Sequence, residues 1–160
     1  MESRHNLHIG KERILIRLYL HGGTVLDGSV FLFPEDGPGV WVWTRVLHYF
    51  NEPLPYFPFD AKGSGGIVLV TRTSVMRATV LNDETNDEDP ALYYVGQTRA
   101  RFLLTDGTAI EGRVFIDSSP PNIRISDFLC KPERFFHVND DAGHEILNKS
   151  EVPLVYPLPD

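Results

Sequence analysis

The sequence predicts an all-β protein built from two tandem, small, strongly bent five-stranded barrels. Three observations lead to this prediction. Apolar and polar residues alternate along several short segments, glycine-containing turns join these segments in pairs, and no long segment has the apolar period of a helix. The pattern from Arg17 to Phe31 also occurs from Arg101 to Phe115, and each copy is typical of a strand, a tight turn and a second strand.

The similarity between the two halves continues beyond these hairpins. The segment 45–57 aligns with 124–136, and 66–75 aligns with 143–152, so the offset falls from 84 to 79 and then to 77 residues. Both changes in offset fall in loop-like segments, which is where two copies of one fold differ in length. The sequence therefore predicts an internal duplication.

The duplication predicts the domain organisation. We expect a polar lead-in over 1–12, a first barrel over 13–81, an acidic linker over 82–92 and a second barrel over 93–160. Residues 82–90 carry five acids and no apolar residue, which is typical of a linker or an exposed loop. Units of about 70 residues are only marginally stable alone, so we expect the two units to pack together or the chain to oligomerise.

Two features within the strands predict how each barrel bends. Ile14, Ile16 and Leu18 alternate with more polar neighbours, as in a strand with one buried face. Gly28 and Gly112 occupy the same inward-facing position in the two copies. A glycine there indicates a sharp bend or a bulge, where a side chain would collide.

Composition excludes several classes of protein. The net charge of −7 disfavours broad binding to nucleic-acid backbones or anionic membranes. No apolar run approaches the ~20 residues of a membrane span, and the N-terminus lacks the apolar core of a signal peptide. The single cysteine, Cys130, excludes an intramolecular disulfide framework and fits a reducing compartment. We therefore expect a cytoplasmic protein.

The order of these segments resembles the Sm-like fold, a small bent barrel of the SH3-like type. The first Sm-type motif resembles Leu18 to Val30, and Phe102 to Val114 in the second copy. The second motif, a hydrophobic strand followed by a basic turn and a short β-branched strand, resembles Val68 to Val75 and Ile146 to Val152. The resemblance covers about two thirds of the chain.

The resemblance implies two functions. Sm-like barrels associate by pairing the fourth strand of one barrel with the fifth strand of the next, which here would involve 67–71 with 75–81 and 144–148 with 152–157. This predicts an assembly or protein-interaction module, with self-association into a homo-oligomer or docking of another protein. The alternative is a ring that binds single-stranded RNA, for which the candidate residues are Arg72, Thr73, Asn122, Lys149 and Ser150. The alternative to that RNA site is that Arg72 and Lys149 are ordinary turn residues.

An aromatic, proline-containing insert is repeated in both copies and supplies the candidate protein-interaction site. The candidate residues are Trp41, Trp43, Arg45, Tyr49, Phe50, Tyr56, Phe57, Arg124, Asp127, Phe128, Phe135 and Phe136. Exposed aromatic and arginine side chains commonly anchor interfaces. The alternative is that these rings close the open end of a barrel or pack one barrel on the other. Ser126 predicts the start of a single helical turn through Leu129.

The sequence contains no recognised catalytic or cofactor-binding pattern. No phosphate-binding loop, nucleophile elbow or paired-histidine zinc motif occurs, so we expect a non-enzymatic protein without a cofactor. His137 and His144 flank Asp140 and Asp141, but their spacing matches no recognised metal site, and a hairpin turn explains the two acids. Cys130 aligns with Asn51, which excludes a repeated catalytic thiol.

Overall fold

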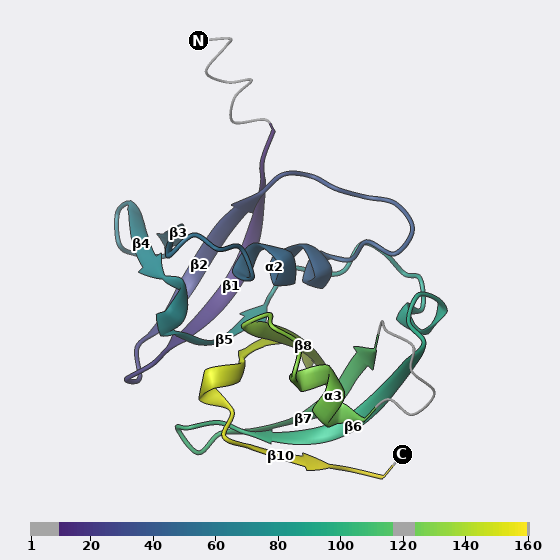
Figure 1. The fold of residues 1–160 in the computed structure, drawn as a ribbon. Helices are drawn as coiled ribbons and strands as arrows, with labels where there is room; N and C mark the ends of the chain where they lie inside the picture. Colours follow the sequence, from purple (N-terminus) through teal and green to yellow (C-terminus); the bar gives the residue numbers. More distant parts are fainter. Residues whose placement is uncertain (1–9, 117–123, 160) are drawn as a thin grey trace.

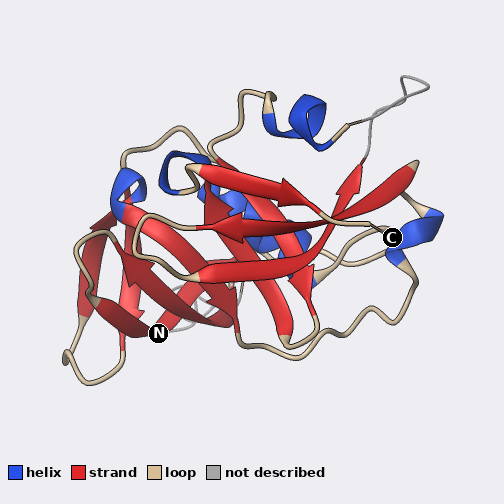
Figure 2. Ribbon diagram, turned by 90° about the horizontal axis from the view of Figure 1, so that it is seen from below, coloured by secondary structure: helices blue, strands red, loops and turns tan. Residues whose placement is uncertain are grey.

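The computed structural model describes residues 10–116 and 124–159 and consists mainly of antiparallel strands (Figures 1 and 2). The strands described are β1 (Glu12–Leu20), β2 (Val25–Leu32), β3 (Tyr56–Ala61), β4 (Ile67–Thr71), β5 (Val75–Val80), β6 (Gly96–Leu103), β7 (Ala109–Ile116), β8 (Phe135–Asp140), β9 (Gly143–Asn148) and β10 (Leu154–Pro157). The helical segments are α2 (Val42–Phe50), α3 (Ile125–Leu129), and the 3₁₀ turns η1 (Arg72–Ser74), η2 (Pro90–Leu92) and η3 (Lys149–Glu151). The all-β prediction is confirmed.

All these strands belong to one sheet, in the order β10-β6-β7-β8-β9-β5-β1-β2-β3-β4. The order within each half is the same, because β5-β1-β2-β3-β4 corresponds to β10-β6-β7-β8-β9. The two halves join where β5 pairs with β9, from Arg77 opposite Leu147 to Val80 opposite His144. The finer prediction of two tandem closed barrels is not confirmed, since the sheet is not closed: β4 and β10 form its two ends, far apart in Figure 1.

The sheet buries two main clusters of apolar side chains. Along β1, Ile14, Ile16 and Leu18 are completely buried, as the alternating pattern predicts. They belong to a cluster that also includes Val46 of α2 and, from the second half, Phe135 and Ile146. A second cluster centres on β6 to β9 and includes Met76 from the first half. Each core therefore contains side chains from the other half.

Gly28 and Gly112 lie where a neighbouring strand crosses closely. A Cβ on Gly28 would lie 2.2 Å from the carbonyl oxygen of Asp60, and one on Gly112 would lie 2.6 Å from that of Asn139. Neither glycine has a positive φ, so the requirement is for space and not for an unusual backbone conformation. The prediction that a side chain would collide is confirmed at both positions, because β3 and β8 cross β2 and β7 closely there.

Helix α2 was not predicted from the sequence. Its first turn is stabilised by Thr44, whose hydroxyl accepts a hydrogen bond from the backbone N–H of Trp41 at 2.8 Å. Val42, Val46 and Phe50 recur at helical spacing and pack into the core of the first half. Pro53, Pro55 and Pro58 all follow the helix, so they only limit its length. The short helical turn predicted to start at Ser126 corresponds to α3, but Arg124 and not Ser126 is its N-cap residue.

Candidate functional site

Most of the predicted interaction residues are inside the molecule. Seven of them are buried: Trp41, Trp43, Arg45, Phe50, Phe57, Phe135 and Phe136. The remaining five are exposed or half-buried: Tyr49, Tyr56, Arg124, Asp127 and Phe128. The insert thus supplies packing in both halves, and only part of it lies on the surface. A partner would reach that part at Tyr56 and along α3.

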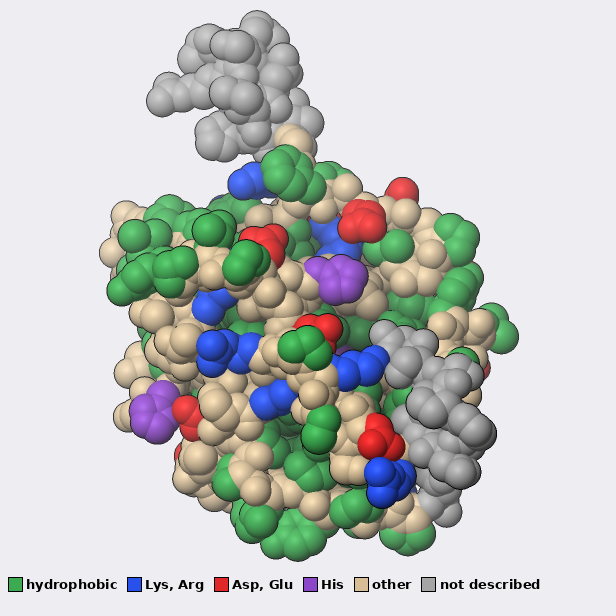
Figure 3. All heavy atoms as spheres, in the orientation of Figure 1, with side chains coloured by type: hydrophobic (Ala, Val, Ile, Leu, Met, Phe, Trp, Pro, Cys, Tyr) green, Lys and Arg blue, Asp and Glu red, His purple; other side chains and the backbone are tan. Residues whose placement is uncertain are grey.

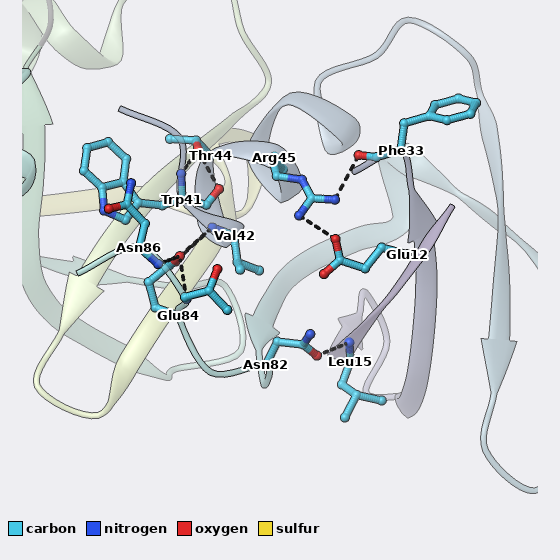
Figure 4. Close-up of polar contacts among 11 residues, drawn as sticks. Glu12, Leu15, Phe33, Trp41, Val42, Thr44, Arg45, Asn82, Glu84 and Asn86 are labelled. Carbon is cyan, nitrogen blue, oxygen red and sulfur yellow. Dashed lines mark hydrogen bonds and ion pairs between the residues drawn. The ribbon is translucent and has the colours of Figure 1, made fainter. Parts of the chain in front are cut away.

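Arg45 and the acidic linker hold the start of α2 in place (Figure 4). The guanidinium of Arg45 donates to the carbonyl oxygen of Phe33 and pairs with Glu12, each at 2.9 Å. The carboxylate of Glu84 accepts the backbone N–H of Val42 at 2.9 Å, where the helix dipole favours a negative charge. Asn86 donates to the carbonyl oxygen of Val40 at 2.7 Å. The linker is therefore docked on the first half.

Arg72 and Lys149, the two basic residues of the RNA alternative, bind backbone carbonyl oxygens of the insert. The guanidinium of Arg72 is buried and donates to three backbone carbonyl oxygens, those of Leu54 at 2.7 Å, Tyr56 at 2.9 Å and Tyr49 at 3.2 Å. At the aligned position, the ammonium of Lys149 donates to the carbonyl oxygen of Lys131 at 2.7 Å. Thr73 and Ser150 are exposed, and Asn122 lies outside the described residues. Arg72 is thus committed to binding its own chain.

The junction between the halves is fixed by side chains as well as by the β5–β9 pairing. The amide of Asn51, at the end of α2, donates to the carbonyl oxygen of Phe135 at 3.1 Å and accepts its backbone N–H at 2.9 Å. Arg77 on β5 forms an ion pair with Glu145 on β9 and lies over the ring of Tyr19, 3.6 Å from its centroid. Burial raises the pKa of the Glu145 carboxyl, while Arg77 opposes the shift.

An aromatic stack also crosses the junction. The indole of Trp43, from α2, lies parallel to the imidazole of His137, from β8, with centroids 3.7 Å apart. Nε2 of His137 is 2.9 Å from Nδ1 of His144, so one nitrogen donates to the other. Burial lowers the pKa of both histidines, most strongly that of His137. Burial in the junction therefore favours the neutral form of both rings.

In the described part of the chain, no cluster of metal-ligating side chains surrounds these histidines. Among residues 10–116 and 124–159, no group of three or more His, Cys, Asp or Glu side chains is positioned to hold a metal ion. The carboxylate of Asp140 accepts the backbone N–H groups of Ala142 and Gly143 at 2.8 and 2.7 Å, as in a hairpin turn. Cys130 is a free thiol on the surface.

The two ends of the sheet expose apolar side chains that have buried counterparts at the junction. On the β3–β4 end, Tyr56 and Leu69 are 55% and 70% exposed. Their aligned residues in the second half, Phe135 and Ile146, are 2% and 0% exposed, because the first half covers them. The other end, β10, exposes Leu154 and Tyr156. The surface that could bind another strand therefore lies at these ends.

Comparisons with known proteins identify no family. No family model matches the chain, and no curated protein or solved structure is significantly similar to it. The Sm-like resemblance therefore stays a prediction from the sequence. Within the described part of the chain, no helix has the length and apolar character needed to span a membrane.

Two parts of this arrangement were missed by sequence reasoning. Glu84 lay in a segment expected to be a linker, and only the helical spacing of Val42, Val46 and Phe50 could have indicated the helix that it caps. Asn51 was considered only for its alignment with Cys130. No local signal marks its contact with Phe135, which lies 84 residues away.

Proposed function

We propose that this protein is a non-enzymatic assembly module, in which β10 of one copy pairs with β4 of the next. One observation carries the proposal: within the chain, the fifth strand of the first half pairs with the fourth strand of the second half. The same two positions, a fourth strand and a fifth strand, are left at the ends of the sheet. A contact between copies would repeat a contact already present within one chain.

The internal junction specifies the register of the contact between copies. The alignment offset of 77 residues converts the β5–β9 register into Leu154 opposite Val70, Val155 opposite Leu69 and Pro157 opposite Ile67. This places exposed Leu69 at the position where Ile146 is buried within the chain. Pairing would also satisfy the open backbone groups at both ends, which otherwise favour non-specific association.

The exposed part of the aromatic insert contributes to the same contact. At the internal junction, the ring of Phe135 packs on Phe50 with centroids 5.4 Å apart. The aligned pair between copies is Tyr56 of one copy and Leu129 of the other, and in this chain Tyr56 is exposed and Leu129 half-buried. Edge pairing and packing of the insert therefore belong to one surface.

The first test is the solution mass by light scattering, with the ultraviolet absorbance ratio recorded on the same peak. We expect the wild-type chain to form an oligomer without nucleic acid, and Leu69→Lys to shift the mass to the monomer. Leu92→Lys is the matched control, because Leu92 is 76% exposed but lies in η2, away from both ends. A monomeric wild type, or equal effects of the two substitutions, would contradict the proposal, while co-purified nucleic acid would favour the RNA alternative.

A cross-linking experiment tests the register. In a Cys130→Ser background, we expect Val155→Cys and Leu69→Cys, mixed as separate chains, to form an intermolecular disulfide, since opposite residues of antiparallel strands lie about 5 Å apart. Val155→Cys with Ile67→Cys is the control, because Ile67 is two residues out of register. Equal yields from both mixtures would exclude the specified register.

A further inference from the structure

A second surface feature lies away from the two ends of the sheet. A pocket of about 190 Å³ lies between α2 and α3 and is lined by residues from both halves. Figure 3 shows the face that carries the two helices, with Lys and Arg side chains gathered around its middle and hydrophobic side chains between them. The proposed pairing of β10 with β4 of the next copy does not use this pocket.

The wall of the pocket is mainly aromatic. Trp43 comes from α2, Phe128 from α3, and Phe136 and His137 from β8. The rings of Phe128 and Phe136 meet edge to face with centroids 6.3 Å apart, so these two rings pack on each other within the wall. A cavity of about 150 Å³ accommodates a benzene ring, so this pocket is large enough for one aromatic ring with a small substituent.

The rim of the pocket is basic. Lys131 and Lys149 line it, and Glu133 is the acid among the described residues around it. Burial, and the nearby charge of Lys131, lower the pKa of the Lys149 ammonium, while Glu133 opposes the shift. The ammonium of Lys149 uses one N–H to bind the carbonyl oxygen of Lys131, and an ammonium has three donors. A bound anion would offset the repulsion between the two lysines and accept the remaining donors.

The wall also contains an unsatisfied donor. The indole N–H of Trp43 is buried and has no hydrogen-bond partner among the described residues. A buried donor without a partner is uncommon, because it has lost its hydrogen bond to water. Because this nitrogen is buried and Trp43 is only 3% exposed, the donor lies beneath the surface of the wall and is not open to the pocket.

From the aromatic wall, the basic rim and the size of the pocket, we propose that it binds a small aromatic carboxylate. The ring packs among Trp43, Phe128 and Phe136, and the carboxylate pairs with the ammonium of Lys149. Because the pocket is lined by both α2 of the first half and β8 of the second, binding would also tie the two halves together.

Tryptophan fluorescence of the full chain tests this proposal with benzoate as the probe. The chain has two tryptophans, and Trp43 is in the wall. We expect a saturable change in emission below about 10 mM benzoate, with benzamide about tenfold weaker and acetate without effect. No saturable change with benzoate would overturn the proposal. Equal binding of benzoate and benzamide would exclude a carboxylate as the recognised group.

Matched lysine variants identify the group that binds the anion. We expect Lys149→Met to weaken benzoate binding about tenfold and to leave benzamide binding unchanged. Lys62→Met is the control, because Lys62 is exposed in the β3–β4 turn and does not line the pocket. Lys131→Met is the second variant, used if Lys149→Met does not fold by circular dichroism. Retention of full benzoate affinity in the folded lysine variant would contradict the proposal.

The measurement is repeated in Leu69→Lys, which removes an exposed side chain at the far end of the sheet. Unchanged benzoate binding in this variant is the expected result, since the pocket lies within one chain. Loss of benzoate binding in Leu69→Lys would place the site between copies and would overturn its assignment to the pocket between α2 and α3.

Discussion

The two halves of the molecule share a strand order but differ in how firmly each holds its aromatic insert. In the first half, Arg72 binds three carbonyl oxygens and Asn51 binds the backbone of Phe135 in the second half. At the aligned positions, Lys149 binds one carbonyl oxygen and Cys130 is exposed. The helix of the first insert, α2, is thus built into the junction, whereas the helix of the second insert, α3, remains partly exposed at the surface. An accessible insert is what a contact with a further copy requires.

The largest expected difference between the halves comes from the two aligned basic residues. Arg72→Met removes a buried, charged hydrogen-bond donor from three carbonyl oxygens. We expect it to lower the free energy of unfolding by about 4 kcal/mol. Lys149→Met removes one half-buried hydrogen bond and should cost about 1 kcal/mol. Urea denaturation of both variants checks the comparison. Equal losses would show that the two inserts are held with equal strength.

The aligned glycines test whether the two strand crossings are equally tight. We expect Gly28→Ala to destabilise the protein by about 3 kcal/mol and Gly112→Ala by somewhat less, because the Cβ of Gly28 would meet a carbonyl oxygen at the shorter distance. Gly66→Ala is the control, since its Cβ would meet nothing within 4 Å and its φ is not positive. Thermal denaturation followed by circular dichroism gives the order, and a loss at Gly66 similar to that at Gly28 would contradict it.

Asn51 and Cys130 provide a direct comparison of one aligned position. Asn51→Ala leaves the N–H and carbonyl of Phe135 without their partner, so we expect a loss of about 2 kcal/mol. Cys130→Ala should change stability by less than about 0.5 kcal/mol, as for most surface positions. Both variants are measured by the same urea titration. A stability loss at Cys130 as large as that at Asn51 would mean that the second insert is also anchored.

His137 and His144, which both lie in the second half, predict that the stability of the protein depends on pH. The folded-state pKa of His137 and of His144 is lowered, so the unfolded chain binds more protons below pH 6.5. Stability is then complete above this pH and falls as the pH decreases, by no more than about 1.4 kcal/mol per pH unit for each histidine. Glu84 and Asp140 reduce the shift of His144, and the raised pKa of Glu145 has the opposite effect on stability.

The difference between wild type and a His137→Phe, His144→Leu variant isolates this contribution. We expect the wild type to lose more stability than the variant between pH 7 and pH 5, measured by urea denaturation at each pH. Parallel curves would show that the pair does not titrate. His48→Gln is the control, because His48 is exposed on α2 and lies outside the stack of Trp43, His137 and His144.

The strands were predictable from the sequence because their causes are local. Alternation along β1 and the space required at Gly28 follow from neighbouring residues and from the repeat. Exposure of the insert was not predictable, because Tyr56 and Phe135 occupy aligned positions and only the strand next to each decides which is buried. The pairing of β5 was not predictable for the same reason. β5 and β10 occupy aligned positions, yet β5 pairs with a strand of the other half and β10 does not.

The sharing of core residues between the halves has a consequence during synthesis. Phe135 and Ile146 complete the core of the first half, yet they follow its last strand, β5, by more than fifty residues. The first half therefore leaves the ribosome with an incomplete core and an open β5 edge. Contacts between such distant residues form slowly, so this edge is exposed until β9 has been translated. During that interval a β5 edge on one nascent chain can capture β9 of another, which makes domain-swapped dimers a specific hazard of this fold.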